Sequence, residues 1–316
     1  MALFLSESDI EKLATMSMAL ESVEEAFRLY GEGKADNAPR RRCQLEAGLL
    51  HVMSASLPTL GFAGLKSYTS VGGKARFLVL VYGGDGELLA VIEADRLGQL
   101  RTGAASGVAT RHMARGNASR LGIIGTGWQA RSQVEAICAV RPIKTAVAFS
   151  RNPERRAAFC SEMSEKLSLG VYPAAAPEEA IRDSDIIVTA TTAKEPVLRG
   201  EWLAAGTHVN AVGSNFRVRQ EIDVETVRRS ACVVVDSVEQ ARLESGDLVR
   251  AAEADAFYWE DAHELGEVVT GEFPGREDDS EITLFESHGI ALEDVALAAR
   301  VYRAALDAGL GTKTPF

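Results

Sequence analysis

Apolar and polar residues alternate in two different ways along this chain. Downstream of residue 120, runs of consecutive apolar residues predict buried strands at 121–124, 145–149, 186–190, 207–212 and 231–235. Apolar residues spaced three or four positions apart predict intervening helices at 128–139, 154–167, 177–183 and 221–229. Strand–helix alternation of this kind is typical of an α/β fold, a doubly wound parallel sheet of the Rossmann type.

The residues before this region show a different pattern. Apolar stretches predict strands at 49–53, 61–69, 76–82 and 88–92. The sequence Gly-Gly-Asp-Gly at 83–86 predicts a hairpin turn between the last two. Because closely spaced consecutive strands pair antiparallel, we expect a second, α+β domain with an antiparallel sheet.

Helical segments flank the predicted antiparallel sheet. Ser8 and Glu11 have the spacing of a capping box before a short first helix, and an amphipathic helix follows it. A small-residue helix is expected over 102–109, with Arg101 just before it. The last helix, through 292–302, falls outside the strand–helix alternation and is expected to return to the first domain.

A glycine motif begins the α/β region. Gly125, Gly127 and Ala130 form a G-x-G-x-x-A turn between the first strand and the first helix. In such a turn the first glycine allows a tight bend, the second lets a pyrophosphate approach, and the alanine permits close helix packing. Thr126, Trp128 and Gln129 lie in the same turn, where Gln129 can reach a phosphate or ribose. A glycine-rich turn without a ligand is the alternative interpretation.

The end of the second strand indicates which dinucleotide is bound. NAD-binding units usually place an acid there for the ribose 2′-hydroxyl, but this chain has Ser150 followed by Arg151. A guanidinium can bind a 2′-phosphate, which a carboxylate would repel. We therefore predict NADP(H) as the preferred cofactor, with NAD(H) possible. Arg155 and Arg156 follow in the next helix; Arg156 is a further cofactor candidate, although a solvated first turn is the simpler expectation for both.

Composition narrows the functional class. The 316-residue chain carries a formal net charge of −11, which argues against a nucleic-acid partner. No apolar run approaches the length of a membrane span, and the scattered cysteines and histidines show no metal-ligand spacing. We expect a soluble cytoplasmic protein of two domains, without a metal site or a membrane partner.

Basic residues in the first domain are candidates for binding a substrate anion. Lys66 interrupts an apolar strand, where its charge is costly unless it is paired or faces water. Arg101 adds positive charge to the start of the predicted helix, which is unfavourable for stability alone. Arg40 and Arg42 belong to a triple-arginine cluster, for which a solvated loop is the alternative.

Several segments together resemble the ornithine cyclodeaminase/μ-crystallin family over nearly the whole chain. They are residues 98–106, 125–131, 209–213, 244–247 and 291–294. The resemblance implies a substrate-binding and dimerisation domain, 1–113 with 290–316, and an NAD(P)-binding Rossmann domain, 114–289. It also implies a homodimer.

The resemblance assigns roles to individual residues. It implies that Lys66, Arg101 and either Arg40 or Arg42 hold the substrate carboxylate, with Met53 in the substrate site. Spacing to Met53 favours Arg40. Thr191 and Val212 match strand ends that contact the cofactor in the family.

One departure from the family pattern concerns the reaction. Where ornithine cyclodeaminases carry an aspartate, this chain has Asn215, whose amide cannot accept a proton at neutral pH. We therefore expect NADPH-dependent reduction of a small α-imino acid, such as the cyclic ketimine Δ1-pyrroline-2-carboxylate, with Lys66 and Arg101 as catalytic residues. The alternatives are ornithine cyclodeamination, an alanine-dehydrogenase-like activity, and non-enzymatic binding of NADPH or a small ligand.

Overall fold

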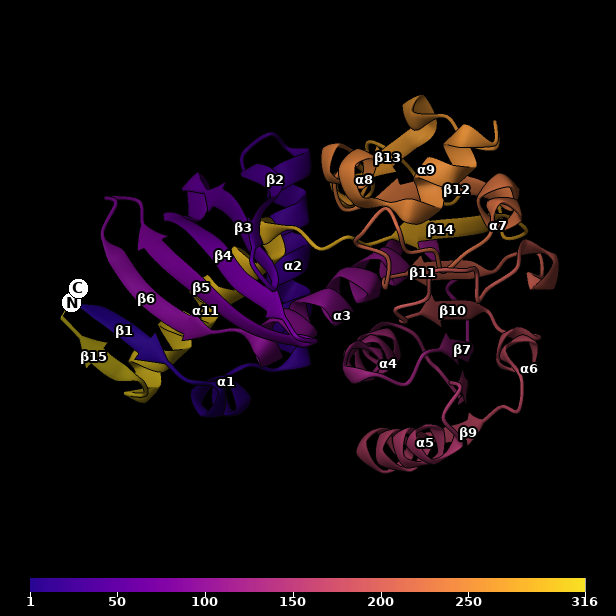
Figure 1. Cartoon of the computed structure of the whole chain (residues 1–316), viewed down its shortest axis with the longest axis horizontal. Coiled ribbons are helices and arrows are strands. Elements are labelled where there is room, and N and C mark those ends of the chain that lie inside the picture. The colour runs from indigo at the N-terminus through magenta and orange to yellow at the C-terminus, as the bar shows by residue number, and fades with distance from the viewer. Residues whose placement is uncertain (316) are drawn as a thin grey trace. The chain divides into compact units, whose positions relative to one another are not determined.

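The computed structural model describes residues 1–315, which fold into two compact units. Unit 1 comprises Met1–Ala104 and Ile290–Phe316, and unit 2 comprises Ala105–Gly289. Each is described by itself below (Figure 1). Among the described residues no helix is both long and apolar enough to cross a membrane. In that same part of the chain, no three His, Cys, Asp or Glu side chains are grouped so that they could hold a metal ion.

Unit 1 contains a seven-stranded sheet in the order β15-β1-β6-β5-β4-β3-β2. Its strands are β1 (Ala2–Leu5), β2 (Asp36–Leu45), β3 (Gly48–Leu57), β4 (Phe62–Val71), β5 (Lys74–Gly83), β6 (Leu88–Glu93) and β15 (Thr312–Thr314). Strands β2 to β6 pair antiparallel in sequence order, which confirms the predicted antiparallel sheet. The terminal strands β1 and β15 extend it.

Helices cover one face of this sheet. They are α1 (Glu7–Leu13), α2 (Met16–Gly31) and α11 (Ala291–Ala308), with the short turn η1 (Pro58–Leu60). Helix α11 packs on α2 and on strands β2 to β5 (Figure 1). The approach is close, since a Cβ at Gly64 of β4 would lie 3.0 Å from the Val295 side chain. The C-terminal helix therefore completes the core of unit 1.

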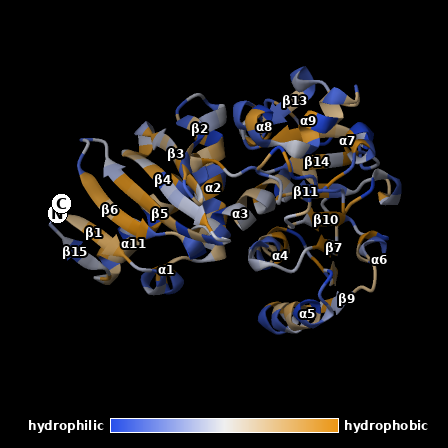
Figure 2. Ribbon diagram, viewed as in Figure 1, coloured by the Kyte–Doolittle hydropathy of each residue, from blue (hydrophilic) through white to orange (hydrophobic). Residues whose placement is uncertain are grey.

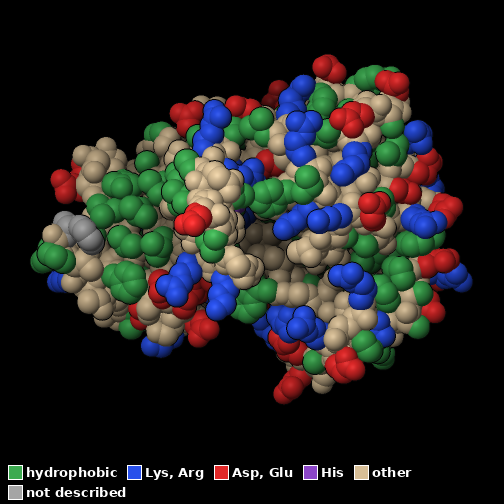
Figure 3. Space-filling model, viewed as in Figure 1, with side chains coloured by type: hydrophobic (Ala, Val, Ile, Leu, Met, Phe, Trp, Pro, Cys, Tyr) green, Lys and Arg blue, Asp and Glu red, His purple; other side chains and the backbone are tan. Residues whose placement is uncertain are grey.

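Alternate residues of the strands face opposite sides of the sheet. Val79 and Val81 of β5 are fully buried, whereas Leu78, the residue directly before Val79, is 39% exposed. Leu65, Leu80 and Val91 lie opposite one another on β4, β5 and β6 and are partly buried. The ribbon is strongly hydrophobic along β5 and β6 (Figure 2), and apolar side chains gather over this part of the unit (Figure 3).

Unit 2 contains an eight-stranded sheet in the order β13-β12-β14-β11-β10-β7-β8-β9, all parallel. Its strands are β7 (Arg120–Ile124), β8 (Thr145–Phe149), β9 (Gly170–Pro173), β10 (Ile186–Thr189), β11 (His208–Ala211), β12 (Ser230–Val235), β13 (Ala262–Glu264) and β14 (Ile282–Glu286). The strand order reverses between β7 and β10, the switch point where such sheets bind ligands. The predicted doubly wound α/β fold is confirmed.

Helices connect the parallel strands of unit 2. They are α4 (Trp128–Val140), α5 (Pro153–Leu167), α6 (Pro177–Ile181), α7 (Val224–Arg229), α8 (Val238–Glu244), α9 (Gly246–Glu253) and α10 (Leu265–Thr270), with the short turns η2 (Gly200–Trp202) and η3 (Trp259–Asp261). Helix α7 begins later than predicted because Asp223 caps it, its side chain accepting a hydrogen bond from the Thr226 backbone N–H. Helix α6 ends two residues earlier than predicted.

Three local predictions in the N-terminal part are wrong. The capping box uses Ser6 and Asp9 rather than Ser8 and Glu11. The small-residue helix is α3 (Asp95–Met113), so Arg101 lies within it rather than before it. Arg40 and Arg42 are not in a loop, because strand β2 extends through both.

Candidate active site

The glycine turn of unit 2 has the backbone that a dinucleotide site requires. Gly125 follows β7 with a φ of +107°, and a Cβ there would collide with the carbonyl oxygen of Ala190 after β10. Gly127 caps α4, and a Cβ there would meet no atom within 4 Å. Ala130 is fully buried against the sheet. The turn is therefore tight on its protein side and open at the helix N-terminus, where N–H groups can bind phosphate.

Polar groups around the turn are arranged to meet a ligand. Thr126 donates a hydrogen bond from its hydroxyl to Ser150 Oγ over 2.8 Å, which joins the glycine turn to the end of β8. Gln129 Oε1 is buried and accepts no hydrogen bond from residues 1–315. Trp128 is 49% exposed at the start of α4. These residues fit a bound dinucleotide.

The structure distinguishes the arginines near the end of β8. Arg156 donates to the Ser150 carbonyl oxygen over 2.6 Å, and its guanidinium lies 5.4 Å from the centre of the Phe149 ring. The expectation of a solvated Arg156 is therefore wrong, because these contacts hold it beside residue 150. Arg151 is exposed and makes no hydrogen bond or ion pair within the described residues.

A buried carboxylate joins the two loops that carry Thr191 and Val212. Glu221 accepts hydrogen bonds from Thr189 Oγ1 (2.9 Å), the Thr191 backbone N–H (2.5 Å) and the Gly213 backbone N–H (2.7 Å). Burial raises the pKa of Glu221. Its contacts fix the ends of β10 and β11 relative to each other, next to the glycine turn.

In unit 1, three basic side chains are buried together on the α11 side of the sheet. Arg40 of β2, Lys66 of β4 and Arg101 of α3 are each less than 10% exposed. Met53 is the cross-strand partner of Lys66, and its sulfur accepts a hydrogen bond from Arg40 Nε over 3.3 Å. The side chain of Lys66 is thus buried, and the alternative of a solvated strand face is wrong.

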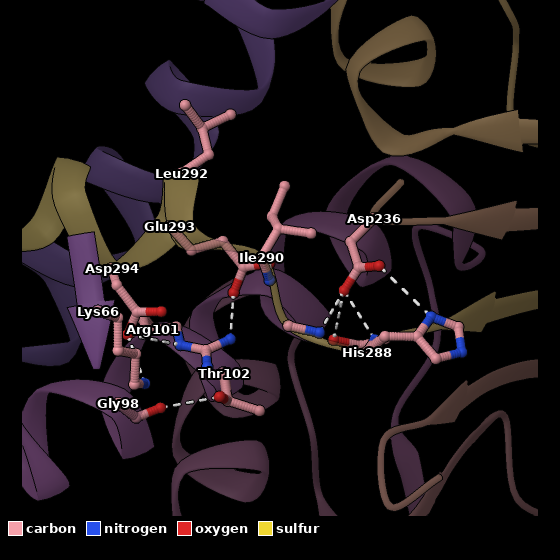
Figure 4. A network of polar contacts seen from close by, with 12 residues as sticks. Lys66, Gly98, Arg101, Thr102, Asp236, His288, Ile290, Leu292, Glu293 and Asp294 are labelled. Carbon is pink, nitrogen blue, oxygen red and sulfur yellow. Dashed lines mark hydrogen bonds and ion pairs between the residues drawn. The ribbon is translucent and has the colours of Figure 1, made fainter. Parts of the chain in front are cut away.

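Two acids from the first turn of α11 pair with these cations (Figure 4). Lys66 Nζ lies 2.7 Å from Asp294 Oδ1, and Arg101 Nε lies 3.1 Å from the same oxygen. Arg101 also donates to Glu293 Oε2 over 2.7 Å. We call these five residues, Arg40, Lys66, Arg101, Glu293 and Asp294, the charged cluster.

The charged cluster has more cations than carboxylates. Arg40, Lys66 and Arg101 bring three positive charges together in the interior of unit 1, and Glu293 and Asp294 pair with Arg101 and Lys66. Nearby His51 does not change this count at neutral pH, because burial and the charges of Arg42 and Arg40 lower its pKa to about 4. Three cationic side chains this close together offer several charge-assisted hydrogen-bond donors to an anion.

A second buried ionic group lies at the ends of β12 and β14 in unit 2. His288 Nδ1 is 3.4 Å from Asp236 Oδ1, and its Nε2 is 3.3 Å from Glu286 Oε1. Although burial opposes it, these carboxylates raise the pKa of His288 to about 10. Asp236 also accepts the backbone N–H groups of His288 (2.7 Å) and Gly289 (2.6 Å), so it anchors the segment that leads into α11 (Figure 4).

The model of the ornithine cyclodeaminase/mu-crystallin family matches residues 1–309. The chain belongs to this family. A Δ1-pyrroline-2-carboxylate reductase from Bacillus cereus is 44% identical over 73% of this chain and 71% of its own length.

Two solved structures of the family closely match the fold. Thermococcus litoralis Δ1-pyrroline-2-carboxylate reductase, bound to NADH and L-proline, has a TM-score of 0.95 and 39% identity, covering 99% of this chain and 100% of that one. A dimer of an archaeal alanine dehydrogenase with bound NAD has a TM-score of 0.94 and 38% identity, covering 100% of this chain and 99% of that one.

Asn215 is tied to the loop after β11. Its Oδ1 accepts a hydrogen bond from Arg219 Nη1 over 3.2 Å, and Arg219 also donates to the Gly213 carbonyl oxygen. An aspartate in this place would face a guanidinium, which would hold it ionised.

The sequence analysis assigned no role to three acids of unit 2, Glu221, Glu244 and Asp247, and all three are buried. Asp247 Oδ1 accepts the backbone N–H groups of Glu221 and Ile222, so it positions the loop carboxylate. A polar residue directly after an apolar strand, as at Asp236, is the signal that could have found that anchor.

Alanine substitutions at the two glycines of the turn should have different effects, one on stability and the other on cofactor binding. Gly125→Ala should lower the free energy of unfolding by about 1–3 kcal/mol, because an alanine would be strained at positive φ and would strike Ala190. Gly127→Ala should leave thermal stability nearly unchanged but weaken dinucleotide affinity by about ten-fold or more. The added methyl group would lie where the pyrophosphate comes close to the backbone. Thermal unfolding and calorimetric titration with NADP⁺ measure the pair. Equal cofactor affinity of Gly127→Ala and wild type would contradict this role.

Proposed function

We propose that this protein is an NADPH-dependent reductase of small α-imino acids, with a cyclic ketimine such as Δ1-pyrroline-2-carboxylate as substrate and the amino acid as product. The burial of three cationic side chains beside one another in the charged cluster is the observation that carries this proposal. Arg40, Lys66 and Arg101 would together bind one substrate carboxylate. The relatives named as Δ1-pyrroline-2-carboxylate reductases support the same substrate class.

Lys66 is suited to supply the proton that imine reduction consumes. Burial and the charges of Arg101 and Arg40 lower its pKa to about 8, although Asp294 opposes this. A group with this pKa is protonated at neutral pH and releases its proton readily. NADPH, when bound, supplies the hydride. The carbon of the C=N bond gains that hydride and the nitrogen gains the proton from Lys66, directly or through water.

The cofactor preference rests on the arginines near Ser150. Position 150, directly after β8, carries Ser150 and not an acid that would bind the ribose 2′-hydroxyl, and Arg156 is held by its contacts to Ser150 and Phe149. Arg151, exposed beside it, offers a second guanidinium. These two positive charges support binding of a 2′-phosphate, and so of NADP(H), with NAD(H) possible. The structures of the relatives contain NADH or NAD.

The rival activities make different demands on the site. Ornithine cyclodeamination requires a group that handles the distal amine, and Asn215 with its neighbour Arg219 does not supply one. An alanine-dehydrogenase-like enzyme would use the same charged cluster with pyruvate and ammonia. A protein that only binds NADPH or a small ligand does not need Lys66 at a pKa near 8.

Steady-state oxidation of NADPH tests the function. With Δ1-pyrroline-2-carboxylate we expect turnover that exceeds the rate with pyruvate plus ammonia, and that falls as pH rises through about 8, where Lys66 loses its proton. Lys66→Met should reduce kcat by about 10²–10⁴-fold while cofactor affinity stays unchanged. Arg156→Ala should reduce the preference for NADPH over NADH about ten-fold, and exposed Arg155→Ala should not. No turnover on any imino acid would contradict the proposal.

We further propose that two copies of the chain associate through the exposed face of the unit 1 sheet. Leu65, Leu78, Leu80 and Val91 present apolar surface there, and the related alanine dehydrogenase structure is a dimer. Light scattering should give twice the chain mass of 33.9 kDa. Leu78→Asp should yield the monomer mass, whereas Leu243→Asp, on the exposed surface of α8, should not. A monomeric wild type would refute this.

A further inference from the structure

The ammonium group of Lys66 is enclosed by charged or polarising groups from four other elements. Asp294 of α11 lies 2.7 Å away, and the Phe77 ring centre of β5 lies 5.1 Å away. Arg101 of α3 and Arg40 of β2 repel it. Asp95, an exposed residue at the start of α3, also interacts with the ammonium group. Burial raises the pKa of the Asp95 carboxyl, and the positive charge of Lys66 opposes that rise.

Backbone geometry brings these groups close together. A Cβ at Gly98 of α3 would lie 3.0 Å from Lys66 Nζ, so the absence of a side chain there makes room for the ammonium. The first turn of α11 is held to β2 because Asn37 Oδ1 accepts the Leu292 backbone N–H over 3.2 Å. The position of Asp294 is thus set by the fold and not by Lys66 alone.

Asp294 and its neighbour Glu293 make different contacts. Asp294 Oδ1 is shared by Lys66 Nζ and Arg101 Nε, while its Oδ2 is buried and accepts no hydrogen bond from residues 1–315. Glu293 contacts Arg101 and the backbone N–H of Ile290 at the start of its own helix. Asp294 is therefore the acid that joins Lys66 to Arg101.

We propose that Asp294 is the positioning residue of the reduction: its shared oxygen holds the two cations side by side for one substrate carboxylate and keeps Lys66 protonated until the imine is bound. This inference rests on the proposed function.

The electrostatic reason lies in the neighbours of Lys66. Without the charge of Asp294, the buried ammonium would face the guanidinium groups of Arg101 and Arg40, while Glu293 pairs with Arg101 and Asp95 lies exposed. An opposite charge this close typically changes a pKa by about 1–3 units, so its removal would lower the pKa of Lys66 further. A neutral lysine neither attracts the carboxylate nor supplies the proton. After each turnover the neutral amine takes a proton back from water, which balances the reaction.

Direct titration of Lys66 tests the proposal without any substrate. The protein is labelled with ¹³C at the lysine ε-carbons, and Lys66→Arg identifies the Lys66 signal by its loss. In wild type this signal should titrate near pH 8. In Asp294→Asn the midpoint should fall by about one pH unit or more, and in Glu293→Gln it should fall by less. Arg101→Gln should raise the midpoint, because one repelling charge is removed.

The pH profile of kcat/KM provides the second readout. The alkaline limb should move to lower pH in Asp294→Asn, and Asp294→Glu should partly restore it, whereas a merely structural role would lower activity at every pH alike. An unchanged Lys66 midpoint in Asp294→Asn, or an equal fall in Glu293→Gln, would overturn the proposal. These titrations remain decisive if no imino acid is turned over, which would refute the proposed function alone. If Asp294→Asn does not fold, the direction in which Arg101→Gln moves the titration midpoint of Lys66 decides.

Discussion

The ion pair between Lys66 and Asp294 is the interaction on which the site depends. Both side chains are almost completely buried, and they come from positions 228 residues apart, so the C-terminal helix must return to the N-terminal sheet to form it. Buried ion pairs contribute little net stability, since desolvation offsets their attraction. The cluster is better explained by function, because three cationic side chains gathered in the interior suit the binding of an anion.

The need to place Lys66 beside Asp294 also explains a backbone feature that would otherwise only lower helix stability. Glycine within a helix lowers its intrinsic stability, yet α3 contains Gly98 where a side chain would approach the Lys66 ammonium. Burial of its neighbours, such as Leu97 and Leu100, stabilises the helix in spite of this composition. In unit 2, Asp236 accepts the backbone N–H groups of His288 and Gly289, the last two residues of that unit.

Local patterns in the sequence predicted much of the fold. Apolar runs identified β3 to β6 of the antiparallel sheet and β7, β8, β10, β11 and β12 of the parallel sheet, and the glycine spacing identified the turn after β7, because these signals depend on residues close in sequence. They missed β14, although it is fully buried between β12 and β11. Strand β2 was missed because its arginines suggest solvent, although β3 pairs with it and Arg40 is buried. Lys66 and Arg101 could be singled out as cations in unfavourable places. The acids that pair with Lys66 and Arg101, and the hydrogen bonds from Glu221 to the ends of β10 and β11, could not be predicted, because those contacts exist only after distant segments pack together.

The central claim is that the charged cluster is completed by one carboxylate. Calorimetric titration of the NADP⁺-loaded protein with L-proline and with L-prolinamide, which lacks that negative charge, tests it most directly. The account predicts that L-proline binds and that L-prolinamide binds at least about ten-fold more weakly, since charge-assisted hydrogen bonds to Lys66 and Arg101 are lost. Equal affinity for the two ligands would contradict it.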